Sequence, residues 1–303
     1  MLCYSNLDHC NKNKSQDDKY DKDALQLESE RLKNEKLKKL GSSDIEIHTN
    51  DSLRKLVERG CYSKLKNNDT SCVTDMRMLF NNYDGYVDGS VLSTWDVSNV
   101  IDMAWMFKGS TIFNWNNYIN NWNVGNVTNM KGMFAGCRNL KQSLDNWDVS
   151  KVKNMSGMFA YCEMFNNPLN NWNVSNVVDM SRMFYACKSF NKDLNNWDVS
   201  NVTNMRSMFS GCYEFDRALV NWNVKNVTDM SYMFYDCSRF NQNLNNWDVT
   251  NVTEILDMFC GCYYLNQSFN QWILNNRKYY RENIMFDGSY FMKESKWPQF
   301  SVS

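Results

Sequence analysis

Apolar and polar residues alternate within a short phrase that recurs through most of the chain. In the copy at residues 146–150, "NWDVS", Trp147 and Val149 alternate with three polar residues. A period of two is typical of a β-strand that buries one face. The phrase therefore predicts a short strand whose tryptophan and valine point into a core.

A second pattern follows each phrase and has the period of a helix. Its apolar residues stand at i, i+3, i+4 and i+7, which is one face of about two helical turns; in one copy they are Met130, Met133, Phe134 and Cys137. Threonines such as Thr128 stand where an N-cap is expected. Each unit therefore predicts one short strand followed by one short helix.

The two patterns recur at a fixed interval. From Trp122 onward, each tryptophan of the series follows the previous one at the same interval as Trp147 follows Trp122. The first interval, from Trp95 to Trp122, is slightly longer. The later members are Trp172, Trp197, Trp222, Trp247 and Trp272. So small a unit cannot bury its apolar face alone, so its copies must stack. The predicted fold class is α/β: a leucine-rich-repeat-like solenoid with a tryptophan ladder, one short parallel strand and one short helix per repeat.

The repeat pattern divides the chain into four parts. Residues 1–42 are rich in charge with scattered leucines, and they predict a flexible tail or a helix. Residues 43–72 contain "TNDSLRKLVERG", which predicts a capped helix closing the N-terminal end. The repeats occupy residues 73–272, with a degenerate first unit. Residues 273–303 are expected to form a helical C-terminal cap.

Composition narrows the class of protein. Hydrophobic residues make up 43% and aromatic residues 15%, which excludes wholesale disorder. The 33 basic and 34 acidic residues nearly cancel, so we expect neither nucleic acid nor a membrane as partner. No apolar run approaches the roughly 20 residues that span a bilayer, and no signal peptide is visible. We expect a cytoplasmic protein, with a surface or virion location as the alternative.

The repeated phrase resembles the BspA-like leucine-rich-repeat family. The resemblance rests on "MFxGCxxFN" followed by "LxxWxV", in the branch whose 25-residue units read W-D-V-S-N-V-T-x-M-x-x-M-F. The second motif is matched by Leu144-Trp147-Val149, Leu194-Trp197-Val199 and Leu244-Trp247-Val249. The resemblance implies a leucine-rich-repeat-like solenoid used for binding, often on bacterial or protist surfaces and also in large DNA viruses.

Few residues suit enzyme chemistry. His9 and His48 are the only histidines, and both lie outside the repeats. No phosphate-binding glycine loop and no H-E-x-x-H motif is present. The regularly spaced cysteines fall on the apolar face, where free cysteine packs as a small hydrophobe, and Cys260 is an additional thiol. We predict a protein that is not an enzyme, with no catalytic residue, no cofactor, no metal and no small-molecule substrate.

The candidate binding residues stand between the buried tryptophan and valine of each phrase. Aspartate and asparagine alternate strictly there: Asp96, Asn123, Asp148, Asn173, Asp198, Asn223 and Asp248. Alternation sets the carboxylates about 10 Å apart, close to the Debye length of roughly 8 Å. We therefore favour relief of repulsion, or duplication of a pair of repeats, as its cause, with selection for a cationic ligand as the alternative. Trp105 and Tyr232 share a position that smaller residues hold in several repeats, so we expect both to be exposed and to serve as candidate binding anchors. Packing under the N-terminal cap is the alternative for Trp105.

We therefore predict an interaction scaffold that presents an extended polar solenoid face to a protein partner. A surface adhesin that binds glycan or host matrix is the alternative, because a polar surface of asparagine, aspartate and tryptophan suits both.

Overall fold

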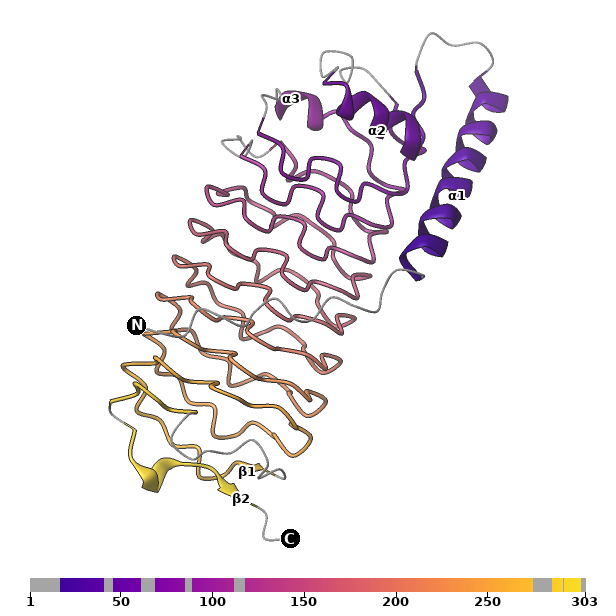
Figure 1. Cartoon of the computed structure of the whole chain (residues 1–303). Helices are drawn as coiled ribbons and strands as arrows, with labels where there is room; N and C mark the ends of the chain where they lie inside the picture. The colour runs from indigo at the N-terminus through magenta and orange to yellow at the C-terminus, as the bar shows by residue number, and fades with distance from the viewer. Residues whose placement is uncertain are drawn as a thin grey trace.

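A computed structural model shows the chain wound into successive coils that stack along one axis (Figure 1). It describes residues 17–40, 46–60, 69–84, 89–111, 118–274, 285–290 and 292–300. The helices near the N-terminus lie at one end of the stack and the two short strands lie at the other. Each coil holds one copy of the repeated unit.

The regular elements of the described residues lie outside the central coils. The helices are α1 (Asp17–Leu40), α2 (Asn50–Glu58), α3 (Gly89–Leu92) and the 3-10 helix η2 (Glu294–Lys296). Strand β1 (Ile273–Leu274) pairs in parallel with β2 (Gln299–Phe300). Residues 118–272 are built from turns and single bridges.

The phrase that predicts a strand forms turns instead. Trp147 and Val149 are buried as the pattern requires, but residues 147–149 form no strand and lie between turns at 145–146 and 150–151. The Asp148 side chain accepts a hydrogen bond from the Ser150 N–H at 3.0 Å, which closes a turn. Parallel pairing between coils is limited to single bridges seven residues after each tryptophan, as between Asn154 and Asp179.

The segment that predicts a helix forms a different ribbon, which we call the turn strip (residues 130–137 and its equivalents). Gly132 and Gly136 have positive φ angles of 57° and 79°, which an α-helix does not contain. Their N–H groups donate to the Ser156 and Ala160 carbonyls of the next coil, at 2.8 and 2.7 Å. A helix would use these amides within its own turns, so the contact between coils replaces the helix.

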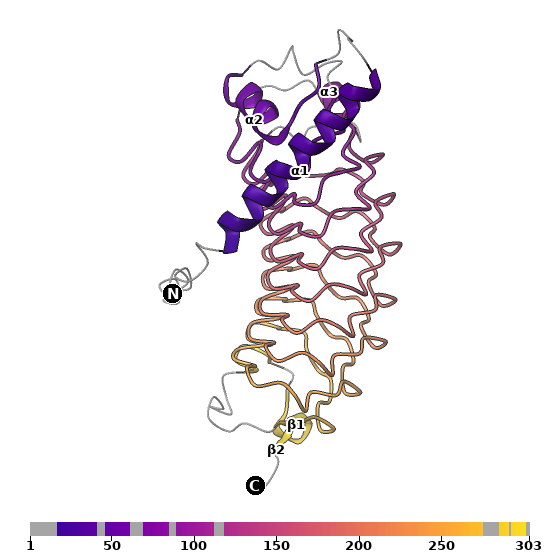
Figure 2. The same ribbon diagram turned by 90° about the vertical axis from the view of Figure 1, so that its right-hand side faces the viewer.

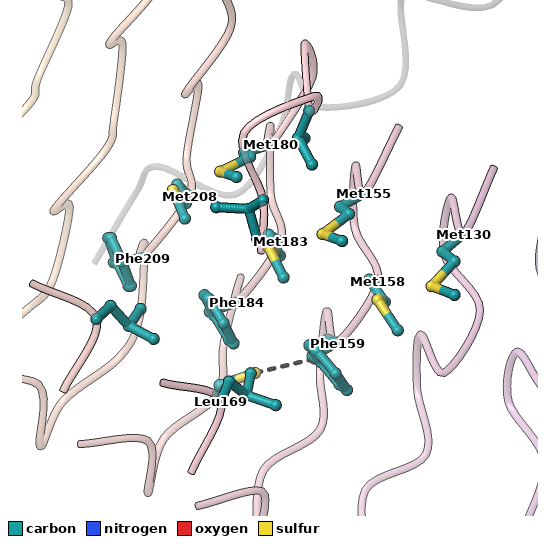
Figure 3. Close-up of a cluster of buried hydrophobic side chains, with 14 of the residues drawn as sticks. Met130, Met155, Met158, Phe159, Leu169, Met180, Met183, Phe184, Met208 and Phe209 are labelled. Atoms are coloured by element: carbon teal, nitrogen blue, oxygen red, sulfur yellow. Dashed lines mark hydrogen bonds between the residues drawn. The ribbon is translucent and has the colours of Figure 1, made fainter. Parts of the chain in front are cut away.

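The core consists of columns of identical side chains. Methionines and phenylalanines of neighbouring coils lie over one another in Figure 3. The Phe184 ring stacks on Phe159 at 5.7 Å and on Phe209 at 5.6 Å between centroids. Tryptophans form another column, and Trp197 donates its Nε1–H to the Leu169 carbonyl of the preceding coil at 3.0 Å. The buried indole is thereby both packed and hydrogen bonded.

The ladder cysteines are buried and unpaired within the described residues. Each donates its S–H to a phenylalanine carbonyl of the preceding coil, as Cys187 does to Phe159 at 2.9 Å (dashed line in Figure 3). Burial raises the pKa of these thiols well above the ordinary range, so they stay protonated. Members with this bond are Cys137, Cys162, Cys187, Cys212, Cys237 and Cys262.

Helix α2 covers the N-terminal end of the stack. Thr49 and Ser52 form a capping box at its start, and Leu53 and Val57 are buried against the first coil. Helix α1 runs beside the first coils (Figures 1 and 2), where Ser29 donates to the Cys72 carbonyl at 2.5 Å. Residues 17–40 of the expected charged tail are therefore helical, and residues 1–16 lie outside the described residues.

At the N-terminal end of the stack, the Asn50 side chain accepts the hydrogen bonds that a backbone carbonyl of the preceding coil accepts elsewhere. Its Oδ1 accepts hydrogen bonds from the N–H groups of Thr74 at 2.8 Å and Asp75 at 3.1 Å. One coil later, the Thr74 carbonyl accepts from Ile101 and Asp102 in the same way, at 2.8 and 3.4 Å. A side-chain amide thus satisfies the donors that face away from the stack.

The repeat pattern continues past residue 272, where we expected only a cap. Phe286 stacks on Phe259 at 5.6 Å, and Ser289 donates to the Phe259 carbonyl at 3.0 Å as the ladder cysteines do. Trp297 stacks on Phe286 at 5.9 Å and follows Trp272 by one further step of the tryptophan series. That interval was the sequence signal for a further, degenerate unit.

Candidate functional site

The alternating aspartates and asparagines form one exposed series along the stack, which we call the Asp/Asn row. All seven members are exposed, and each directly follows a buried tryptophan of its own coil. Because successive coils are in register, equivalent residues follow one another along the axis. The row consists of Asp96, Asn123, Asp148, Asn173, Asp198, Asn223 and Asp248.

Every member of the row holds a turn with one side-chain oxygen. This oxygen accepts a hydrogen bond from the backbone N–H two residues later, at distances between 2.9 and 3.3 Å. Such Asx turns fix the side chain against the backbone. The second carboxylate oxygen, or the asparagine amide group, is left for other contacts.

Asp148, Asp198 and Asp248 of the row are negatively charged at neutral pH. The Ser150 hydroxyl and N–H hold the pKa of Asp148 below its ordinary value, and Ser200 does the same for Asp198. Thr250 likewise lowers the pKa of Asp248. Hydrogen bonds to the ionised carboxylate favour that form.

A second column of asparagines keeps the turns of the row in place. Asn176 donates from Nδ2 to the Ser150 carbonyl at 2.7 Å, and Asn201 donates to Ser175 at 2.7 Å. Lys151 stands where this column has an asparagine elsewhere, and its Nζ donates to the Asn126 Oδ1 at 2.6 Å. The row is therefore mounted on turns that are tied from one coil to the next.

Trp105 and Tyr232 lie in the turn strip, away from the row, and both are half-buried rather than exposed. The indole of Trp105 covers Gly132 of the next coil so closely that a Cβ there would lie 2.3 Å from the ring. Lys131 places its Nζ 5.0 Å from the Trp105 ring centroid, and Arg206 lies 4.9 Å from that of Tyr232. Packing against the neighbouring coil therefore explains both side chains.

Sequence reasoning missed a group of exposed tyrosines toward the C-terminal end of the stack. Tyr213, Tyr263, Tyr264 and Tyr290 expose 43%, 45%, 61% and 79% of their surface. Tyr213 and Tyr263 directly follow ladder cysteines, and Tyr290 follows Ser289. Elsewhere that position holds a charged or polar residue, so the change of residue type was visible in the sequence.

The described residues contain no group of three or more His, Cys, Asp or Glu side chains that could hold a metal ion. Among the helices of the described ranges, none is long and apolar enough to cross a bilayer.

Comparison with known proteins identifies a family but no individual relative. Residues 52–118, 114–216 and 192–297 each match the same family, and these tandem matches agree with the repeated aromatic columns. Searches of curated proteins and of solved structures found no match. The matched segments span most of the 303 residues, so the chain belongs to the family described as "Mycoplasma protein of unknown function, DUF285".

Proposed function

We propose that this chain is a non-enzymatic scaffold for protein–protein interaction and that the Asp/Asn row is its contact surface. One observation carries the proposal: seven exposed polar side chains, from Asp96 to Asp248, are fixed in the same Asx turn in successive coils. Groups that are already ordered lose little conformational entropy when a partner binds. Each contact is weak, and affinity comes from several used together.

The charge of the row favours a partner with basic residues. Asp148 and Asp198 are ionised, and the asparagine between them, Asn173, adds neutral donors and acceptors. Complementary charge at an exposed surface mainly raises the association rate and is screened by salt. Binding through the row should therefore weaken as ionic strength rises.

The finer family assignment is part of the same proposal. The buried "LxxWxV" positions, such as Leu194, Trp197 and Val199, support the BspA-like leucine-rich-repeat branch. In this variant of the α/β solenoid, the strand is reduced to a single bridge and the helix to the turn strip. A cytoplasmic location also belongs to the proposal.

Paired substitutions separate charge from turn geometry. The double variant Asp148→Asn with Asp198→Asn keeps the side-chain oxygens that accept the turn hydrogen bonds and removes two negative charges. The corresponding double alanine variant removes the two charges and the acceptor oxygens as well. We expect affinity capture of the partner to fall for the asparagine pair at low salt, and to fall further for the alanine pair. Asn196→Ala, a neighbouring exposed residue, serves as the control. Undiminished capture by the alanine pair would exclude the row as the contact surface.

A surface adhesin for glycan or host matrix is the second candidate. The exposed tyrosines Tyr263, Tyr264 and Tyr290 favour it, because their flat rings offer apolar area with a polar tip. Binding to a glycan array that is lost on tyrosine substitution, and retained in the Asp148 and Asp198 variants, would support the adhesin over the scaffold.

A further inference from the structure

The position of the Asp/Asn row is also filled one coil before Asp96, by Asp69. The Oδ1 of Asp69 accepts a hydrogen bond from the Ser71 N–H at 3.0 Å, which is the Asx turn of the row. Asn99 donates from Nδ2 to the Ser71 carbonyl at 2.7 Å, as the asparagine column does in later coils. The turn of Asp69 is therefore the same structural unit as the turns of the row.

A lysine of helix α1 binds to this turn. The Nζ of Lys36 forms an ion pair with the Oδ2 of Asp69 and donates a hydrogen bond to the Ser71 hydroxyl at 2.5 Å. Oδ2 is the carboxylate oxygen that the Asx turn does not use. Helix α1 lies across the first coils, which brings the lysine to this place (Figure 2). The chain itself thus shows which cation such a turn accepts and which two oxygen atoms hold it.

The order of residues at this position agrees with the contact. Asp69 and Asp96 are neighbours, whereas from Asp96 on an asparagine separates each aspartate from the next. Carboxylates in neighbouring coils, about 5 Å apart, repel each other, and alternation with asparagine relieves that repulsion. The two neighbouring aspartates occur where Lys36 supplies a positive charge. A lysine at the turn therefore offsets the repulsion that alternation relieves in the rest of the row.

The same pair of oxygen atoms recurs in the exposed part of the row. A hydroxyl residue stands two residues after each aspartate there: Ser150 after Asp148, Ser200 after Asp198 and Thr250 after Asp248. These aspartates are exposed, and each accepts the turn N–H through Oδ1 as Asp69 does. Each of them therefore presents the carboxylate and hydroxyl oxygens that hold Lys36 in the first coil.

The spacing of these aspartates matches one face of an α-helix. Alternation places them two coils apart, which is about 10 Å. In an α-helix, residues i and i+7 lie on the same face and about 10.5 Å apart along the axis. Residues on one face of an extended strand are only about 7 Å apart. Lysines at i, i+7 and i+14 of a helix that lies along the stack therefore match Asp148, Asp198 and Asp248.

One lysine of the solenoid stands close to the row and opposes a further cation. The Ser150 hydroxyl and N–H lower the pKa of Asp148, and the charge of Lys151 lowers it further. The Nζ of Lys151 donates to the Asn126 Oδ1 at 2.6 Å, which fixes this charge beside the turn. Loss of the Lys151 charge should therefore strengthen the binding of a basic segment at Asp148.

We propose that the partner segment bound by the Asp/Asn row is an α-helix that carries a lysine at every seventh residue. Each ammonium group lies between the free carboxylate oxygen of an aspartate and the hydroxyl two residues later, as Lys36 does at Asp69. The inference rests on the proposed function, because it names the chemistry of the partner for the same surface.

The test uses the full chain and a fluorescent peptide rich in alanine and glutamine. The peptide has about 21 residues, which is long enough to form a helix in water, and carries lysines at i, i+7 and i+14. A second peptide has the same composition with lysines at i, i+5 and i+10, which places them on different faces. We expect saturable binding of the first peptide by fluorescence anisotropy at low ionic strength. The second peptide should bind about fivefold more weakly, because it cannot form all the ion pairs at once.

Variants of the chain identify the residues that bind the peptide. Asp198→Asn should weaken the Kd about threefold, and its combination with Asp148→Asn about tenfold, because each exposed ion pair is weak. Asp193→Asn is the matched control and should leave the Kd unchanged. Asp193 is exposed in the same coil and holds a separate Asx turn with the Asn195 N–H at 2.9 Å. Lys151→Gln should tighten the Kd, a gain that a misfolded variant does not produce.

Three results would each overturn the inference: no binding of the first peptide, equal binding of the two peptides, or the same Kd for Asp198→Asn and Asp193→Asn. Affinity capture of the partner distinguishes this failure from failure of the proposed function. If the Asp148 and Asp198 variants lose the partner while neither peptide binds, the row is the contact surface and the lysine-bearing helix is excluded. Undiminished capture by the variants overturns the proposed function itself, whatever the peptides do.

Discussion

Single side chains complete hydrogen bonds that a coil cannot complete by itself. Asn50 supplies a carbonyl where the stack begins, Trp197 reaches the backbone of the preceding coil, and Cys187 does so through sulfur. An unmade hydrogen bond in a buried place costs about 1–3 kcal/mol, more than a made one contributes. Polar atoms in this core therefore determine where each coil sits on the next.

Asn50→Ala should lower the free energy of unfolding by about 2–4 kcal/mol, because the buried donors of Thr74 and Asp75 lose their acceptor. Urea denaturation followed by tryptophan fluorescence measures the change. Asn196→Ala, an exposed asparagine of the repeats, should stay within about 0.5 kcal/mol of the parent. Equal losses in the two variants would contradict the role given to Asn50.

Acid should destabilise the chain partly through the Asp/Asn row. The folded-state pKa values of Asp148 and Asp198 lie below the ordinary value of 3.8, so their stabilising contribution is complete above that pH and is lost as the pH falls through the folded values. Asp148→Asn with Asp198→Asn should therefore show a shallower loss of thermal stability below pH 3.8. An unchanged acid slope would argue against the hydrogen bonds assigned to these carboxylates.

The turn strip shows how an element can keep a side-chain pattern and change its backbone. The burial of Met130, Met133 and Phe134 could be predicted from their spacing, which a helix and the strip satisfy equally. The backbone conformation of the turn strip could not be predicted from the sequence, because the residues with positive φ are glycine in some coils but Arg182 or Tyr232 in others. Parallel contact between coils overrides the local preference of those residues.

Exchanging residue types at this left-handed position tests the strip directly. Gly157 has φ 62° and only the Ala160 Cβ at 3.9 Å near its missing side chain, so Gly157→Ala adds backbone strain without a clash. We expect a loss of about 1–2 kcal/mol. Arg182 has φ 56° and is exposed, so Arg182→Gly should gain about 0.5–1 kcal/mol. A helix in this segment would give the opposite sign for Arg182→Gly.

The site could be predicted only in part for a related reason. Exposure of Asp148 and its equivalents follows from alternation with buried neighbours, and that much was readable in the sequence. The half-burial of Trp105 depends on a glycine in the following coil, Gly132, and no local pattern contains that relation. The hydrogen bonds of the turn strip depend on which way the backbone amides point, as in the bond from Gly132 to Ser156, and side-chain patterns do not record that direction.

At the scale of the whole molecule, the coils form one continuous core in which every interior unit has two neighbours. The columns run from Leu53 in α2 to Phe286 near the C-terminal end. In such stacks stability is close to a sum of unit and interface terms. Buried groups in the middle should therefore be protected more strongly than those at the ends.

The reactivity of the cysteine thiols should depend on how well each is protected by burial in the stack. Cys187 and Cys212 are fully buried and held protonated, whereas Cys260 is half-buried. Native labelling with iodoacetamide, read by mass spectrometry, should modify Cys260 well before either ladder cysteine. Cys3 and Cys10, outside the described residues, are predicted to react early. Fast labelling of Cys187 in the folded protein would contradict the packed cysteine column.

The backbone hydrogen bonds of the turn strip run from each coil to the next, as from Gly132 to Ser156 and from Phe184 to Met208, and they have a mechanical consequence. A force applied along the axis pulls on these bonds in their own direction and loads the interfaces one after another. An end coil has one neighbour, so it should detach first and leave the next coil in the same position. Each detached coil would lengthen the chain by roughly 80–90 Å when fully extended. Under tension, the stack should therefore unfold in steps of equal length, with one coil released in each step.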